Sequence, residues 1–99
     1  MTEERRSDPR VPVNLTAKWD GQSGEHEARI EDIGMGGCFV NTVSRVNLGE
    51  VIGLEINLPS GKWLRIRGEV ITYHEAVGFG MVFTFLTEEV ELALREIAG

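Results

Sequence analysis

The feature that most restricts the fold of this chain is an alternation of apolar and polar residues that begins at Val11. From Val11 to Trp19 every second residue is apolar, and the residues between them are proline, asparagine, threonine and lysine. Successive side chains of a β-strand point to opposite faces, so the alternation predicts a strand that is buried on one side. Further apolar segments bounded by turn residues predict strands over residues 26–31, 38–40, 54–58, 63–73 and 77–85.

The connections between these segments carry the residues that favour turns. Residues 20–24 and 59–62 are rich in glycine, serine, aspartate and proline. In the longer connection over residues 41–49, we expect Val46 and Leu48 to pack against the core. In the last strand we expect one apolar row in the core and two glycines on the opposite face, where they allow close contact; the row is Val77, Phe79, Met81, Phe83 and Phe85, and the glycines are Gly78 and Gly80.

The final segment has the pattern of an amphipathic helix. Thr87 suits the N-cap position, and Glu88 and Arg95 carry the charges that favour the two ends of a helix dipole. An apolar stripe at helical spacing consists of Leu86, Val90, Ala93, Leu94 and Ile97. The sequence therefore predicts an all-β domain over residues 11–99, a six-stranded antiparallel β-barrel with a C-terminal α-helix from about residue 87. We expect the polar residues 1–10 to form a flexible arm.

Size and charge limit the classes of function. A chain of 99 residues with 41% hydrophobic content fits one small domain. A formal net charge of -6 argues against non-specific binding of nucleic acid or of a membrane surface, so an anionic ligand must be small and held locally, and we expect no membrane insertion. The only cysteine, Cys38, has no internal disulfide partner, and no apolar run is long enough for a signal peptide or a membrane span. We therefore expect a cytoplasmic protein.

The inventory of reactive residues does not favour an enzyme. His26 and His74 are far apart in the sequence, Cys38 stands alone, and no Walker, HExxH or GxSxG pattern occurs. One cysteine and two scattered histidines also do not match the spacing of a zinc site. We expect no catalytic residues and no metal ligands.

Two other stretches carry binding chemistry. Residues 32–37 contain Asp32 and three glycines between two apolar segments, which fits either a binding turn or a bulged hairpin. Arg5, Arg6 and Arg10 are three of the ten basic residues. Guanidinium groups bind phosphate oxygens and the O6 and N7 acceptors of guanine, although these arginines also have acidic neighbours with which to pair.

Together these features resemble the PilZ domain, a bacterial receptor module for cyclic di-GMP. Arg5, Arg6 and Arg10 match the family's amino-terminal RRxxxR element, and Asp32 and Gly37 match the ends of its (D/N)xSxxG element. Residues 80–83 match the glycine, aliphatic and phenylalanine positions of the family's closing strand. One departure is Gly34, which stands where the family has serine.

The resemblance implies a non-catalytic receptor with no cofactor other than its ligand, cyclic di-GMP. The implied ligand-binding residues are Arg5, Arg6, Arg10, Asp32, Gly34 and Gly37. A downstream protein partner is also implied. Two alternatives remain: a PilZ adaptor that does not bind the nucleotide and acts through protein contacts in motility or type IV pilus regulation, and an oligonucleotide-binding barrel, which the acidic composition disfavours.

Overall fold

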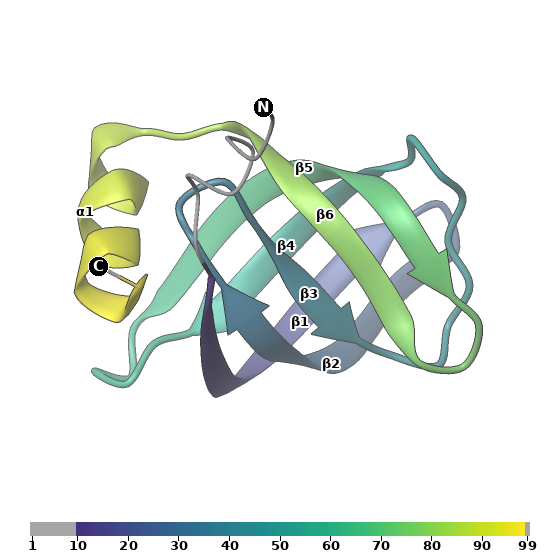
Figure 1. Ribbon diagram of the computed structural model, residues 1–99, viewed down its shortest axis with the longest axis horizontal. Helices are drawn as coiled ribbons and strands as arrows, with labels where there is room; N and C mark the ends of the chain where they lie inside the picture. Colours follow the sequence, from purple (N-terminus) through teal and green to yellow (C-terminus); the bar gives the residue numbers. More distant parts are fainter. Residues whose placement is uncertain (1–9, 99) are drawn as a thin grey trace, which may run out of the picture.

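The structure is a computed structural model, and it describes residues 10–98. This part of the chain forms six strands and one helix (Figure 1). All the strand pairs are antiparallel, and the barrel closes in the order β1-β2-β3-β6-β5-β4. The helix lies at one end of the barrel, on the left in Figure 1, and contacts β5. The predicted fold class is confirmed. The elements are β1 (Val11–Gly21), β2 (Gly24–Ile33), β3 (Gly37–Asn41), β4 (Val51–Asn57), β5 (Trp63–His74), β6 (Gly78–Phe85) and α1 (Glu88–Ala98).

The core fills the inside of the barrel with the apolar residues that alternate along each strand. Trp19 of β1 and Phe79 of β6 meet edge to face at its centre, with ring centroids 5.3 Å apart. Such an arrangement stabilises an aromatic pair beyond the apolar area that it buries. The other fully buried large side chains include Ile30, Ile33, Val40, Ile52, Leu54, Ile56, Val70, Met81 and Leu94.

The end of β6 departs from the predicted alternation. Phe79 and Met81 are buried as expected, but Phe85 is 73% exposed. Gly68 of β5 lies opposite Phe83 while its neighbour Arg67 lies opposite Phe85, so β6 has one extra residue at this point. Such a bulge moves the residues that follow it to the other face of the sheet. Phe85 therefore joins Arg67 on the outside of the barrel.

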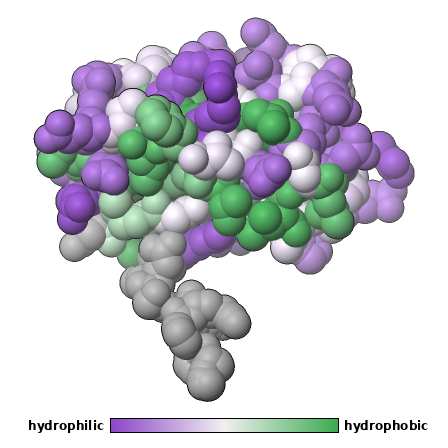
Figure 2. All heavy atoms as spheres, turned by 90° about the horizontal axis from the view of Figure 1, so that it is seen from above, coloured by the Kyte–Doolittle hydropathy of each residue, from purple (hydrophilic) through white to green (hydrophobic). Residues whose placement is uncertain are grey.

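Two other residues that we expected in the core are also at the surface. Val77 precedes β6 in the turn after β5 and is 52% exposed. Leu48 lies in a turn before β4 and is exposed, whereas Val46 is buried as predicted. In the space-filling view, hydrophobic residues reach the surface in several separate places among hydrophilic ones (Figure 2). Val77 is exposed because the alternation of β6 does not extend into the turn before it, and Leu48 is exposed because it lies in a turn at the surface of the connection.

The helix begins where the sequence predicts. The backbone nitrogen of Val90 donates to the Thr87 hydroxyl oxygen at 3.2 Å, which is the side-chain hydrogen bond of an N-cap. Val90 and Leu94 are buried, while Ala93 and Ile97 pack at the edge of the core. The predicted stripe therefore closes one end of the barrel.

The turn between β5 and β6 contains a strained residue. Ala76 has a φ of 64°. An L-residue in this left-handed region is less stable by about 1–2 kcal/mol, and the greater freedom of glycine in the unfolded chain offsets up to about 1 kcal/mol of the relief. We expect Ala76→Gly to raise the free energy of unfolding in urea by about 0.5–1 kcal/mol. Ala93→Gly, inside α1, is the matched control and should lower it by about 1 kcal/mol. A loss at both positions would show that Ala76 is not strained.

Candidate functional site

The glycine-containing turn joins β2 to β3 and is held against β6. Asp32 ends β2 together with Ile33, and Gly37 begins β3. The backbone nitrogen of Gly34 donates to the Gly37 oxygen at 2.9 Å, and that of Phe83 donates to the Gly36 oxygen at 2.8 Å. The turn is therefore part of an irregular hairpin, and its backbone position is fixed by the neighbouring strand.

Arg10 lies directly above this turn. Pro12 of β1 is the cross-strand partner of Asp32, and this register brings Arg10 to the same place. The Arg10 Nη1 donates to the Asp32 Oδ1 at 3.1 Å, and both side chains are 34% exposed. A surface ion pair stabilises a protein by only about 0–1 kcal/mol. Its more important effect is positional, because it holds at the barrel surface a guanidinium group that has more N–H donors than the one given to Asp32.

Gly37 is required at its position by the approach of β6. A Cβ atom at Gly37 would overlap the main-chain oxygen of Met81 and would lie 3.1 Å from the Arg10 Nη2. A side chain here would therefore push apart β3 and β6 and displace the guanidinium group. The sequence identifies Gly37 only as the last glycine of the segment that begins with Asp32, and the close packing of β3 against β6 is the structural reason for a glycine here.

The remaining predicted site residues fall into two groups. Gly34 lies in the same turn, and the residues with positive φ within the described range 10–98 are Gly24, Gly49, Gly61, Gly78 and Ala76. The backbone at Gly34 therefore has a φ that serine can adopt. Arg5 and Arg6 lie outside the described residues. The structure brings together Arg10, Asp32 and Gly37, with Gly34 beside them.

Cys38 lies under this surface and is fully buried. Burial raises the pKa of its thiol from the ordinary value of 9.0 to about 12, with the Arg10 charge lowering this pKa and the Asp32 charge raising it. The thiol is therefore protonated at neutral pH. A protonated, buried thiol is a poor nucleophile, so Cys38 belongs to the core rather than to the chemistry of the surface above it.

The raised pKa predicts a loss of stability at alkaline pH. The folded state retains the thiol proton while the unfolded chain releases it above about pH 9, so this contribution is complete below pH 9 and disappears as the pH rises towards 12. We expect the free energy of unfolding to fall by up to about 1.4 kcal/mol per pH unit in this window. The control is Cys38→Ala, which lacks the effect. A difference between the two proteins that stays constant from pH 8 to pH 10.5 would contradict the prediction.

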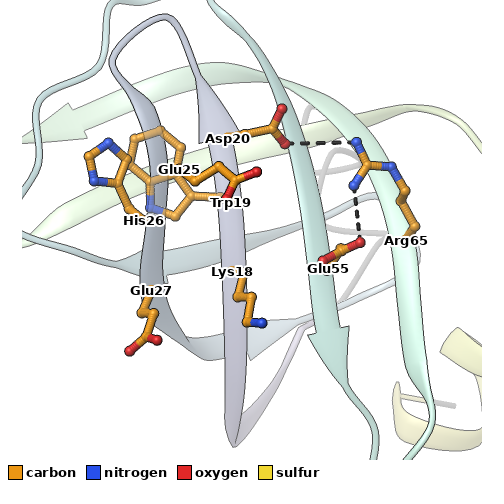
Figure 3. A pocket seen from close by; sticks show the side chains of 8 residues that line it. All are labelled: Lys18, Trp19, Asp20, Glu25, His26, Glu27, Glu55 and Arg65. Carbon is orange, nitrogen blue, oxygen red and sulfur yellow. Dashed lines mark hydrogen bonds and ion pairs between the residues drawn. The ribbon is translucent and has the colours of Figure 1, made fainter.

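A hollow of about 430 Å³ on another part of the surface has unsuitable charge for a phosphate ligand (Figure 3). Arg65 is already engaged there by Asp20 at 3.8 Å and by Glu55 at 3.2 Å. Two more carboxylates, Glu25 and Glu27, face the same hollow. Lys18 also lines the hollow, but four carboxylates outnumber the two basic side chains and repel an anion, so Arg10 offers the better site.

The described residues, 10–98, contain no group of three or more His, Cys, Asp or Glu side chains that could hold a metal ion. Over the same range no helix has the length and apolar character needed to cross a membrane.

One neighbour of this surface is absent from the predicted site. Phe39 lies two residues after Gly37 on the same strand and is the cross-strand partner of Asp32. Residues at positions i and i+2 of a strand share a face, so this spacing was the available signal in the sequence. The residues that surround the Phe39 ring follow only from the pairing of β3 with both β2 and β6, which the sequence does not show.

Comparisons with known proteins identify the family and the fold of this chain. The family model described as the PilZ domain matches residues 4–98. None of the curated proteins matches the sequence significantly. Among solved structures, the Bacillus subtilis inhibitor of motility MotI/DgrA has a TM-score of 0.79 at 18% identity, covering 96% of this chain and 49% of that one. The present chain thus spans about half the length of MotI/DgrA.

Two further structures show the same fold. The PilZ domain of YcgR from Escherichia coli, solved with cyclic di-GMP, has a TM-score of 0.77 at 15% identity, covering 96% of this chain and 89% of that one. The PilZ domain of CeSA from a cellulose-synthesizing bacterium has a TM-score of 0.69 at 17% identity, covering 90% and 93%. Since the family model spans residues 4–98 of 99, this chain belongs to the PilZ domain family.

Proposed function

We propose that this protein is a non-catalytic receptor for cyclic di-GMP that changes its conformation or its partner binding when the nucleotide binds. The observation that carries the proposal is the Arg10–Asp32 ion pair above Gly37, in which a cation and an acceptor are held side by side. The cyclic di-GMP in the YcgR PilZ domain supports the choice of ligand. Arg5 and Arg6 are proposed as additional ligands to the phosphates and the guanine edge.

The chemistry of the two described side chains suits this nucleotide. The Arg10 guanidinium has donors beyond the one given to Asp32, and these fit phosphate oxygens or guanine O6 and N7. Asp32 can accept hydrogen bonds from guanine N1–H and N2–H. Because the whole chain has a net charge of -6, the attraction of the ligand must come from these local cations and should weaken with added salt.

Calorimetric titration of the full chain with cyclic di-GMP tests the proposal. Cyclic di-AMP is the matched control, because it has the same phosphate ring but its bases lack the N1–H and N2–H donors that Asp32 would accept. We expect saturable binding of the guanine compound and much weaker binding of the adenine compound. No binding of cyclic di-GMP at high micromolar concentration, with folded protein shown by circular dichroism, would reject the proposal.

Gly34→Ser should strengthen this binding. The φ at Gly34 lies outside the positive range, so serine introduces no left-handed strain. A restored hydroxyl group can form one hydrogen bond, worth about 0.5–1.5 kcal/mol or up to about tenfold in affinity. The dissociation constant for cyclic di-GMP and the thermal unfolding midpoint are measured for the variant and for the parent protein. An unchanged midpoint with unchanged or weaker affinity would show that the hydroxyl group is not what this site lacks.

An adaptor that ignores the nucleotide is the second candidate, favoured by two exposed aromatic residues. Trp63 and Phe85 are 42% and 73% exposed. They border a groove of about 570 Å³ beside the start of α1, into which Arg67 also reaches. Exposed aromatic and arginine side chains are enriched at protein interfaces. Partner capture that is indifferent to cyclic di-GMP and survives Arg10→Ala, but is lost in Phe85→Ser, would favour this function.

A further inference from the structure

Phe39 lies on the outer face of β3, next to the residues of the proposed site. Its cross-strand neighbours are Asp32 on β2 and Gly80 on β6. It is only partly buried, unlike the flanking Cys38 and Val40, whose side chains point into the core. An aromatic ring therefore reaches solvent beside the acceptor that the proposed function assigns to guanine.

The ring is supported from below by bare backbone. A Cβ atom on Gly78 would lie 2.9 Å from the Phe39 Cε2, and one on Gly80 would lie 3.9 Å from its Cδ1. The ring thus covers two successive outward positions of β6 that have no side chains. This arrangement uses both glycines of the last strand and fixes the ring along the barrel surface, towards His74, whose ring centroid is 6.1 Å away.

The charged part of the site is on the same face. Gly37 and Phe39 are two residues apart on β3 and so share that face, and the Arg10 Nη2 lies above Gly37. Arg10, Asp32 and Phe39 therefore lie on one face of the barrel, where they supply a cation, an acceptor and an apolar ring. A ligand with a planar heterocycle, hydrogen-bond donors and a phosphate has one group to match each of them: the ring for Phe39, the donors for Asp32 and the phosphate for Arg10.

We propose that Phe39 is the platform on which one guanine base of the nucleotide stacks, with the donor edge of the base turned towards Asp32. The inference rests on the proposed function and adds a base-binding residue outside the predicted set. Stacking between a base and an aromatic side chain is sequence-tolerant, so Phe39 supplies affinity for the base and Asp32 supplies the choice of guanine. Arg10 then faces the phosphate side of the same nucleotide.

The test compares Phe39→Leu with Phe39→Tyr. Leucine keeps apolar cover over Gly78 and Gly80 but has no aromatic face, whereas tyrosine keeps the ring. Loss of one stacked base corresponds to about five- to 150-fold in affinity, so we expect Phe39→Leu to weaken cyclic di-GMP binding at least about fivefold and Phe39→Tyr to bind within about twofold of the parent. In proton NMR spectra, the ring current should shift the guanine H8 signal upfield with the parent and Phe39→Tyr only.

The outcomes separate the two proposals. Binding by the parent together with unchanged affinity and an unchanged H8 shift in Phe39→Leu would overturn the platform and leave the receptor intact. No binding by the parent would overturn both. If Phe39→Leu does not fold, the test uses the complex of the parent protein with cyclic di-GMP. Cross-relaxation between the Phe39 ring protons and guanine H8 would support the platform. Its absence from a saturated complex would reject the platform.

Discussion

Replacing Arg10 with alanine is expected to weaken cyclic di-GMP binding by about 30- to 5,000-fold, equivalent to about 2–5 kcal/mol. Arg10 is the one described arginine beside the β2–β3 turn, where Asp32 holds it at 3.1 Å and Gly37 leaves space for it. Its removal takes away the donors to the ligand and leaves Asp32 without a counter-charge next to the phosphates. Titration calorimetry measures the effect.

Two variants serve as controls for this change. Arg95→Ala removes the same side chain from an exposed position at the end of α1 and should leave the affinity unchanged. Arg10→Lys retains the charge but loses the planar fork, so its affinity should fall between those of the parent and the alanine variant. The unfolding midpoint should change little, because the Arg10–Asp32 pair is partly exposed. Equal affinities for Arg10→Ala and Arg95→Ala would contradict a role for Arg10.

The barrel could be predicted because its rule is local. Alternation along a strand decides which side chains face the core, and Trp19, Ile30, Ile56 and Met81 are buried as this rule requires. Phe85 could not be placed in the same way, because a bulge depends on how β6 pairs with β5 and leaves no mark on the period of β6 alone. Local patterns therefore identify strands more reliably than they identify the face of a residue near the end of a strand.

The charged residues of the candidate site could be proposed from the sequence, but the aromatic residue beside them, Phe39, could not. Arg10 and Asp32 have chemistry that suggests a ligand wherever they lie, and the structure places them in contact. Phe39 has no such chemistry of its own. Its position depends on Asp32 on one side and on two glycines of β6, about forty residues further along the chain, on the other. Only the closed register of β2, β3 and β6 brings these residues to one face.

The glycines of the chain also differ in what they do, which the sequence does not reveal. Gly24 has a φ of 107°, and an added Cβ atom would meet nothing within 4 Å. Gly78 has a φ of 155°, and an added Cβ atom would overlap the main-chain oxygen of Val40 and would also lie 2.9 Å from the Phe39 ring. The first glycine is needed for its backbone angle alone. The second is needed because two strands and an aromatic ring meet over it.

This difference predicts that Gly78→Ala is much more destabilising than Gly24→Ala. Backbone strain at Gly24 should lower the free energy of unfolding by about 1–2 kcal/mol. At Gly78, forcing a methyl group against the Val40 carbonyl adds an overpacking penalty of about 1–3 kcal/mol, for a total of about 2–5 kcal/mol. Small domains are stable by only about 5–15 kcal/mol, so the Gly78 variant should begin to unfold at low urea concentration.

Urea denaturation followed by far-ultraviolet circular dichroism measures both variants under the same conditions. Gly24→Ala is a close control, because it adds the same methyl group at another glycine with positive φ and differs in having open space around it. The gap between the two losses therefore isolates the close approach of β3 to β6, the same pair of strands that carries Gly37 and Phe39. Equal losses at both positions would mean that β3 can move away from β6 without penalty, and that the surface above them is not held in place by this contact.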